Sequence, residues 1–572
     1  MSQPSPSFLD DRERIVGGRR APWLIVVIVA LVFGRVIGQG ISPIDDRQTI
    51  FANPKMNRPD PPELFGDRGG GWYWKHGAQG LFIPVTYSLW FLLAMVSWSQ
   101  RPDANGTRLD PRIFHAASLL IYIGNTLLVY WLLRKLLRAR QVQSYMPALA
   151  GALVYGLHPL QVESVAWISG MKDLLYCGFS LIALLLYVQA VEPSATDRSD
   201  DVPWKRIASY LGGIAAMVVG MLCKPTAMVV PLMAFVIDLL ILRRRLIKVA
   251  LSVLPYLITA IPLMIVAKIM QPALGVPTPL LWQRPIVAGA SLAFYLGKLI
   301  APVGLAFDYG WRPAVMVQKP WFWWIAGVPL VLGIILLRLR QRRPWLLAGA
   351  LIGAAALLPV LGLNPFLFQF YSTVADHYMV LAMLGAAIAV AGLLSGQPDE
   401  PRRPALAAVA VISIILGVLS FLQLGYWNTE DDMLRQILAV NPQSAMALNH
   451  MGEIDIARGD LKNAETAFAG TLANPLETSG TENLVHLYVI EGRPQKAVDA
   501  FRQLLVIVSR FPAEARPDIS DWPMKMTNMA IQTDHWRDVP FYLPYIAQIW
   551  FANNFESWLG GPMVKYLPAM HH

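Results

Sequence analysis

The chain of 572 residues contains 55% hydrophobic but only 15% charged residues, and its formal net charge is +10. Soluble domains carry about 25% charged residues, so this composition indicates a membrane protein. The basic residues gather in short turns between long apolar runs, a distribution that membrane topology explains and that argues against nucleic-acid binding. We therefore expect these basic residues to lie at the surface of the lipid bilayer, and we expect no nucleic acid as a partner.

Apolar runs long enough to cross a bilayer, which takes about 17–25 residues, recur along most of the chain. The first run follows Arg19-Arg20 and lacks a cleavage site between small residues, so we expect it to remain as a crossing. The pattern predicts an all-α, polytopic membrane protein with about eleven crossings. They are expected at 22–40, 113–133, 148–165, 173–191, 207–223, 226–242, 249–270, 321–338, 344–362, 375–395 and 404–426.

The basic clusters orient these crossings. If the arginine-rich turns stay in the cytoplasm, the N-terminus is cytoplasmic and residues 41–112 form the first outer loop. Crossings at 81–98 or 286–303 would carry the basic clusters at 134–140 or 338–343 to the outer face. We therefore expect 81–98 to be a helix in the outer interface, and 286–303 to be re-entrant or interfacial.

The chain changes character after residue 426. We divide it into a membrane domain, 1–426, and an outer helical domain, 427–572, in which the apolar runs are shorter and amphipathic. Two segments of the outer domain repeat at a spacing of 33 residues, close to the period of a tetratricopeptide repeat. The matched pairs are Gly459 and Gly492, Ala464 and Ala497, and Phe468 and Phe501. Two roles are open for this domain: a cap on the membrane domain, or a groove for an extended polypeptide.

An aspartate pair, Asp45-Asp46, directly follows the first crossing on the predicted outer face. Acids beside a membrane span are costly unless they meet water, a cation or a substrate. One interpretation is a general base that takes a proton from an acceptor hydroxyl or amine. The other is a solvated start of the loop, with Asp46 paired to Arg47.

A second polar stretch, 158–173, joins two predicted crossings on the same face. It contains His158, Glu163, Lys172 and Asp173. Cations such as Lys172, oriented by neighbouring acids, would suit a phosphate-linked donor. The alternative is a structural salt bridge between Lys172 and either Asp173 or Glu163.

Further cations stand at outward ends of apolar runs: Lys224, Lys298 and His377, the last followed by Tyr378. Single lysines that snorkel to the interface are common there, but three cations on one face indicate a site for an anionic headgroup. Zinc-type spacings, phosphate-binding glycine loops and nucleophile elbows are absent from the sequence. No resident metal or cofactor is indicated, although a divalent metal is compatible with the chemistry, and the activated group should arrive on a carrier.

The two cysteines, Cys177 and Cys223, lie near outward ends of crossings. A disulfide between them is one interpretation. We favour the other, in which both are small buried apolar residues.

The chain resembles the GT-C superfamily of polytopic glycosyltransferases, and more closely the transmembrane O-mannosyltransferases with C-terminal tetratricopeptide repeats, bacterial relatives included. The resemblance rests on Asp45-Asp46, on the stretch from His158-Pro159 to Lys172-Asp173, on Ala375-Asp376-His377-Tyr378 and on the terminal repeats. It covers most of the chain. Where this family often has arginine, the chain has Met171 and His377.

The resemblance implies a function and a location. It implies a glycosyltransferase of the bacterial inner membrane that uses a sugar on a polyprenyl-phosphate carrier at the periplasmic face and inverts the anomeric centre. Asp45 would be the general base with Asp46 beside it, and Asp173 would match an acid that opens a later span. Lys172, Lys224 and His377 would lie near the donor phosphate. We expect Ser/Thr hydroxyls of exported protein as acceptors, bound with help from the repeats.

Three other functions remain open on the sequence. A transferase or ligase for surface polysaccharide or lipid would need no polypeptide-binding repeats. A transporter of lipid-linked sugars would place its polar residues at mid-membrane on broken helices. A non-catalytic scaffold would recruit partners through the repeats alone.

Overall fold

The computed structural model describes residues 8–57, 71–76, 81–102, 106–192, 202–270, 278–395, 403–511 and 516–545. Within these ranges the chain is helical and contains no β-strand, apart from an isolated bridge between Trp98 and Leu109. The predicted all-α fold of a polytopic membrane protein is confirmed. Parts of the predicted outer loop and outer domain, at 58–70, 77–80, 103–105, 512–515 and 546–572, lie outside the described residues.

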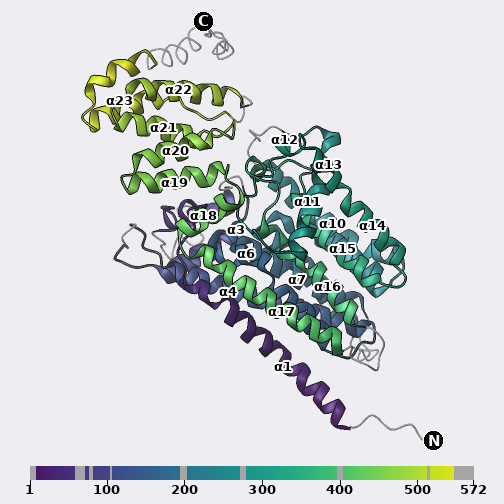
Figure 1. The fold of residues 1–572 in the computed structure, drawn as a ribbon. Helices are drawn as coiled ribbons and strands as arrows, with labels where there is room; N and C mark the ends of the chain where they lie inside the picture. The colour runs from purple at the N-terminus through teal and green to yellow at the C-terminus, as the bar shows by residue number, and fades with distance from the viewer. Residues whose placement is uncertain are drawn as a thin grey trace, which may run out of the picture.

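A bundle of long helices forms the larger part of the molecule (Figure 1). Its helices are α1 Phe8–Phe33, α2 Trp72–Lys75, α3 Pro84–Ser97, α4 Pro111–Ala139, α5 Met146–Leu157, α6 Val162–Ala166, α7 Met171–Val191, α8 Val202–Cys223, α9 Val230–Val236, α10 Leu246–Ile269, α11 Arg284–Ile300, α12 Pro313–Met316, α13 Pro320–Ala326, α14 Val328–Leu339, α15 Pro344–Leu357, α16 Met379–Leu394 and α17 Arg403–Gln423. Helices α4 and α16 each pack against α5 and α7, and α1 and α17 lie against α5.

Nine helical segments of the described chain are long and apolar enough to cross a membrane. They match nine of the eleven predicted crossings. The other two, 148–165 and 344–362, are the shorter helices α5 and α15, of 12 and 14 residues. At 1.5 Å per residue, α5 is about 18 Å long, less than the ~30 Å hydrocarbon core of a bilayer. The helices at these two predicted crossings are therefore shorter than the hydrocarbon core, and their crossing of the membrane stays a prediction.

Close backbone contacts hold the short helices in the bundle. A Cβ on Gly151 of α5 would lie 2.6 Å from the carbonyl oxygen of Ala387 in α16. A Cβ on Gly385 of α16 would lie 2.2 Å from the carbonyl oxygen of Gly349 in α15. Small residues let membrane helices approach closely where dispersion forces replace the hydrophobic effect. Close packing against neighbouring helices therefore holds the short helices in the bundle.

The two segments predicted to lie at the outer interface are also short. The first, α3, has 14 residues, and the second, α11, has 17. The Tyr73 and Tyr87 rings stack at 3.9 Å and join α2 to α3, and Thr86 Oγ1 donates to the carbonyl of Cys223 at the end of α8. This fastens α3 to the bundle. Its position at a membrane surface remains a prediction.

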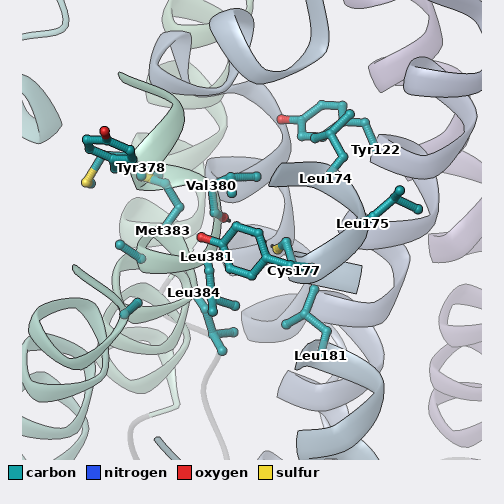
Figure 2. Packing of buried hydrophobic residues seen from close by; sticks show 14 of the residues in the cluster. Tyr122, Leu174, Leu175, Cys177, Leu181, Tyr378, Val380, Leu381, Met383 and Leu384 are labelled. Carbon is teal, nitrogen blue, oxygen red and sulfur yellow. Dashed lines mark hydrogen bonds between the residues drawn. The ribbon is translucent and has the colours of Figure 1, made fainter. Parts of the chain in front are cut away.

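Helices α7 and α16 bring the chemistry-bearing segments to the same end of the bundle. Figure 2 shows their buried side chains, among them Cys177 and Leu381, between the two helices. The Cys177 thiol lies 3.3 Å from the Tyr155 hydroxyl and donates to the carbonyl of Val380. Cys177 and Cys223 are both buried and free, as favoured from the sequence.

The C-terminal helices stack in successive pairs beyond the bundle (Figure 1). They are α18 Glu430–Val440, α19 Ala445–Ala457, α20 Leu461–Thr471, α21 Ser479–Ile490, α22 Pro494–Ser509 and α23 Trp522–Gln532. The repeated glycines, Gly459 and Gly492, form the α19–α20 and α21–α22 turns with φ of 78° and 64°, a conformation that glycine adopts without strain. The repeated Phe468 and Phe501 are fully buried.

The predicted boundary at residue 427 falls between α17 and α18, but the hydrophobic cores divide later. Met433 and Leu434 of α18 belong to the core of the bundle, whereas a separate core begins at Ala464 of α20. Helix α18 is also tied to the loop after α11, because Gln436 Nε2 donates to the carbonyl of Leu305 at 2.9 Å. Helix α18 therefore packs as part of the bundle.

Candidate active site

The aspartate pair lies in a tight loop that is fixed to the turn before α7. Asp46 is fully buried, and its two carboxylate oxygens accept the backbone N–H groups of Ser169, at 2.7 Å, and Ser42, at 3.1 Å. Trp167 Nε1 donates to the carbonyl of Ile44 at 3.0 Å. These contacts join two segments more than 120 residues apart in the sequence. Asp46 is thus a structural anchor of the loop.

Asp45 has a different environment from its neighbour. It has φ of 65°, in the left-handed region that non-glycine residues adopt at a cost of about 1–2 kcal/mol. It is half-buried, and within the described residues its carboxylate has no hydrogen-bond or ion-pair partner. The loop therefore holds Asp45 in a strained conformation with its carboxylate available.

The buried carboxyl of Asp46 has an altered affinity for protons. Burial raises its pKa from 3.8 to about 7, although the hydrogen bonds from Ser169 and Ser42 act in the opposite direction. Repulsion from Asp45 adds to the rise. The alternative in which Asp46 pairs with Arg47 is not observed, since Arg47 is exposed and Asp46 is enclosed.

Lys172 extends from the first turn of α7 toward this loop. Its Nζ donates to the carbonyl of Ser169 at 3.0 Å and lies 4.0 Å from the centre of the Trp167 ring. The side chain is nearly buried, and it interacts electrostatically with Asp45 as well as with Asp173. A carbonyl and an aromatic face hold a cation without neutralising it. Lys172 therefore lies within electrostatic reach of Asp45.

Asp173 pairs with Lys224 and not with Lys172. Lys224 Nζ lies 2.5 Å from one carboxylate oxygen of Asp173, and the other oxygen has no partner within the described residues. The Asp173 side chain is fully buried, while that of Lys224 is 12% exposed. The proposed structural bridge from Lys172 is therefore replaced by one that joins α7 to the turn after α8.

Glu163 pairs with His377. The Nδ1 atom of His377 contacts one carboxylate oxygen of Glu163, and both side chains are buried. The His377 ring lies 5.3 Å from that of Trp167 and 4.3 Å from that of Tyr378, and it interacts electrostatically with both Lys172 and Lys224. The structure thus brings three of the predicted cations together around one region.

Tyr378 completes the wall of this region. The Nζ of Lys224 lies 5.4 Å from the centre of its ring and 5.7 Å from that of Tyr176. Tyr378 is 7% exposed and follows His377 in the turn that precedes α16. Aromatic faces around Lys224 thus stabilise a cation in a site that excludes most water.

Two predicted binding residues have other partners. His158 accepts the N–H of Leu160 at Nδ1, and its Nε2 donates to the carbonyl of Leu299, so both ring nitrogens serve the backbone. Lys298 donates to the carbonyls of Val303 and Gly304 and closes the end of α11. Burial lowers the pKa of Lys298. The geometry gives both residues a structural role beside the site.

The sequence alone did not single out several residues that shape the site. Tyr309 donates to Asp376 at 2.8 Å and accepts the N–H of Ala306, which places the loop after α11 against the turn that carries His377. Ser169 acts through its backbone, which carries no signature in the sequence. A small pocket reaches Glu163 and Asp376 from the side of Trp427 in the link before α18.

Comparison with known proteins places this geometry in context. No family model matches the chain. It is 25% identical over 295 residues to the protein O-mannosyl-transferase Tmtc2 of Drosophila melanogaster, a match that covers 48% of this chain and 29% of that protein. It is 21% identical over 436 residues to the protein O-mannosyl-transferase F38B6.6 of Caenorhabditis elegans, covering 74% and 58%. The predicted resemblance to protein O-mannosyltransferases is confirmed.

A human O-mannosyltransferase relative, TMTC4, is 25% identical over 230 residues, which cover 38% of this chain and 29% of that protein. The chain thus spans less than a third of the fly and human relatives and 58% of the nematode one. A solved structure, the apo oligosaccharyltransferase of Archaeoglobus fulgidus, matches with a TM-score of 0.39 and 13% identity, covering 76% of this chain and 58% of the other.

Within the described residues no group of three or more His, Cys, Asp or Glu side chains is arranged to hold a metal ion. The acids of the site are instead distributed over separate partners: Asp46 on backbone N–H groups, Asp173 on Lys224, and Glu163 on His377. Asp45 differs from all three because its carboxylate has no such partner within the described chain.

Proposed function

We propose that this chain is a membrane glycosyltransferase that moves a sugar from a polyprenyl-phosphate carrier to Ser/Thr hydroxyls of exported protein. The site would lie at the periplasmic face of a bacterial inner membrane, with the N-terminus in the cytoplasm. The observation that carries the proposal is the unpartnered carboxylate of Asp45, held beside Lys172 by an anchored loop. The names of the O-mannosyltransferase relatives support a sugar-transfer reaction, with mannose as the first sugar to test.

The donor phosphate would bind among the cations. Lys172 keeps N–H donors free for an anion, because its described partners are one carbonyl and one ring face. The Lys224 side chain is 12% exposed, and its ammonium is paired with Asp173. Cationic groups fixed in a largely dry site stabilise the charge that develops on a leaving phosphate without reorganisation during the reaction.

In the transfer step the acceptor hydroxyl oxygen forms a bond to the anomeric carbon of the sugar. The bond from that carbon to the phosphate oxygen breaks, and its electron pair leaves with the polyprenyl phosphate. The hydroxyl proton passes to Asp45 as general base. Attack from the side opposite to the phosphate inverts the anomeric centre. The phosphate is a stable anion, so the site needs mainly positioning and positive charge.

Asp46 would support this step through position alone. Its two carboxylate oxygens accept backbone N–H groups and its side chain is fully buried, so it holds the loop and is not accessible to the acceptor. The strain in Asp45 is then maintained by the neighbouring contacts of Asp46 and Trp167. The two adjacent acids thus have different proposed roles: Asp45 is the general base, and Asp46 anchors the loop.

The C-terminal helix pairs would bind the acceptor polypeptide. Stacked helix pairs form concave surfaces that suit extended chains. The 33-residue period of the repeats and their buried Phe468 and Phe501 support this role. Their attachment through α18 would place a bound polypeptide beside the loop after α11, which borders the site.

The test is sugar transfer by the purified full chain in nanodiscs. Radiolabelled polyprenyl-phosphate mannose is supplied with a Ser/Thr-rich peptide, and product is measured by scintillation and mass spectrometry. Loss of a general base lowers rates by about 10²–10⁴-fold, so Asp45→Asn should reduce transfer by at least ~100-fold. Asparagine tolerates positive φ, which keeps the loop intact.

Asp534→Asn is the matched control. Asp534 also has positive φ, 63°, but it is exposed in the C-terminal segment, so its substitution should leave transfer unchanged. Transfer to a polysaccharide or lipid acceptor, and not to the peptide, would move the proposal to the other class of transferase. Full activity of the Asp45→Asn variant would refute the assignment of the base.

A further inference from the structure

A second cavity, with a mostly apolar lining and two arginines, lies at the other end of the bundle from the aspartate loop. Helix α7 begins beside Asp173 and ends at Val191, 21 residues and so about 30 Å along its axis. There a cavity of about 290 Å³ opens between the ends of α7, α8 and α10. Its lining includes Ala190, Val191, Arg206, Tyr210, Arg244 and Ser252. None of these residues takes part in the site proposed for sugar transfer.

Two arginines of this cavity are held in fixed positions. Arg206 Nε donates to the carbonyl of Ala190 at 2.9 Å, and its two terminal nitrogens have no partner within the described residues. Arg244 donates from one terminal nitrogen to Asp238, at 2.7 Å, and from the other to Ser252 Oγ, at 3.3 Å. Arg206 therefore presents both terminal nitrogens to whatever enters the cavity, in the planar geometry that matches two phosphate oxygens.

Among the described residues that line the cavity, one positive charge has no acidic partner. Asp238 is fully buried, also accepts from the Tyr187 hydroxyl at 2.7 Å, and neutralises Arg244. Glu192, at the end of α7, interacts with Lys135 of α4. The remaining charge is that of Arg206. A monoanion such as a phosphodiester would neutralise the charge of Arg206, whereas a dianion would bring one negative charge more than Arg206 can neutralise.

The walls beside the cavity carry exposed apolar side chains. Ile207 and Leu211 of α8 are each 58% exposed, and both line the cavity. Leu251 of α10 is 62% exposed. Exposed apolar side chains at this density on membrane helices contact lipid acyl chains. Trp204, 66% exposed one turn earlier on α8, has the amphipathic ring that prefers the headgroup level.

We propose that this cavity binds the phosphodiester headgroup of an anionic membrane phospholipid. Arg206 would hold the phosphate with its two terminal nitrogens, and the acyl chains would follow the apolar faces of α8 and α10. Basic pockets between membrane helices are a recognised setting for anionic headgroups. This site does not depend on the proposed transferase activity, because the two lie at opposite ends of α7.

Native mass spectrometry of the full chain, released from nanodiscs of phosphatidylglycerol or of phosphatidylcholine, tests the proposal. The wild-type protein should retain one phosphatidylglycerol molecule and no phosphatidylcholine at the same lipid concentration. The Arg206→Gln variant should bind phosphatidylglycerol at least about tenfold more weakly, since it loses charge-assisted hydrogen bonds. The Arg338→Gln variant is the matched control, because Arg338 is exposed at the end of α14 and outside the cavity.

A third arm adds inorganic phosphate to protein in phosphatidylcholine. No phosphate adduct is expected, because a free phosphate lacks the acyl chains. A phosphate adduct that disappears in Arg206→Gln would overturn the lipid assignment. Equal retention of phosphatidylglycerol by Arg206→Gln and Arg338→Gln would overturn the site. Circular dichroism and gel filtration confirm that each variant is folded, and a milder Arg206→Lys variant should retain part of the binding.

Discussion

The ammonium of Lys224 lies 2.5 Å from the carboxylate of Asp173 and joins the turn after α8 to the first turn of α7. The preceding residue in α7, Lys172, binds the Ser169 carbonyl and the Trp167 ring instead. The two lysines thus have different tasks, although both reach the same end of the bundle. Lys224 neutralises a buried acid, whereas Lys172 has no ion-pair partner within the described residues and interacts electrostatically with Asp45.

The first prediction concerns this ion pair. Lys224→Met should lower the free energy of unfolding by about 3–5 kcal/mol, because it leaves the charge of Asp173 buried without a partner. The double variant with Asp173→Asn should recover part of the loss. Thermal unfolding in nanodiscs, followed by tryptophan fluorescence, measures both. Purely additive effects in the double variant would mean that the two side chains do not interact.

The second prediction concerns pH. A carboxyl whose pKa is higher in the folded chain binds more protons when folded than when unfolded, between the two pKa values. With values of 3.8 and about 7, the Asp46 carboxyl makes the protein less stable as the pH rises from about 4 to about 7, by roughly 4 kcal/mol in all. Asp46→Asn should flatten this part of the stability curve. Unfolding temperatures of both proteins from pH 4 to 8 provide the measurement.

The third prediction concerns the short helices. Gly385→Ala should destabilise the bundle strongly, since the new Cβ would lie 2.2 Å from the carbonyl oxygen of Gly349. Gly333→Ala, in α14, is the matched control: no atom lies within 4 Å of its added Cβ, and alanine favours helix by up to ~1 kcal/mol. Unfolding temperatures should fall for the first variant and be equal or higher for the second. Equal effects would contradict the close contact of α15 and α16.

The fourth prediction concerns the link to the C-terminal helices. Asp308 is buried and accepts from Ser444 Oγ, at 2.6 Å, and from Asn441 Nδ2, at 3.1 Å. Asp308→Ala should remove these bonds and speed hydrogen exchange in α18 and α19. Asp499→Ala, at an exposed position of α22, should leave those rates unchanged. If exchange accelerates equally in the two variants, Asp308 is not a specific link.

The fifth prediction separates the two roles of Trp167. Trp167→Phe keeps an aromatic face for Lys172 but loses the hydrogen bond to the Ile44 carbonyl, so the loop of Asp45 should be less well fixed. Transfer should slow by about 5–10-fold, the equivalent of one hydrogen bond, with a small change in KM for the donor. Trp167→Leu also loses the cation contact and should raise that KM. Steady-state kinetics with varied donor concentration distinguish these outcomes.

The position of the polar segments could be predicted from the sequence, because the direction of each crossing decides which helix ends share a face. Lys172, Lys224 and His377 indeed meet. Their partners could not be predicted. Lys224 contacts an acid 51 residues away in the sequence, and His377 contacts one 214 residues away. At such sequence separations the pairing of side chains depends on tertiary packing.

The roles within Asp45-Asp46 could not be predicted either. Adjacent identical residues have the same chemistry, and only the fold shows that Asp46 is enclosed by backbone N–H groups while Asp45 is left with positive φ. The helix lengths at two crossings were the other difference. The predicted crossing 148–165 includes polar residues from His158 onward, which the structure places in a short helical turn and in α6, and α15 is followed by a short helical turn at Leu358–Val360.

The positive φ of Asp45 also restricts how the chain can vary. Glycine adopts this backbone conformation without strain, and asparagine and aspartate adopt it more often than most other residues do. The first two lack a carboxylate, and glutamate would keep one only by accepting both strain and a longer reach. If the proposed base is correct, position 45 has a single good residue, and a swap of one acid for the other there is among the more severe changes available to the protein.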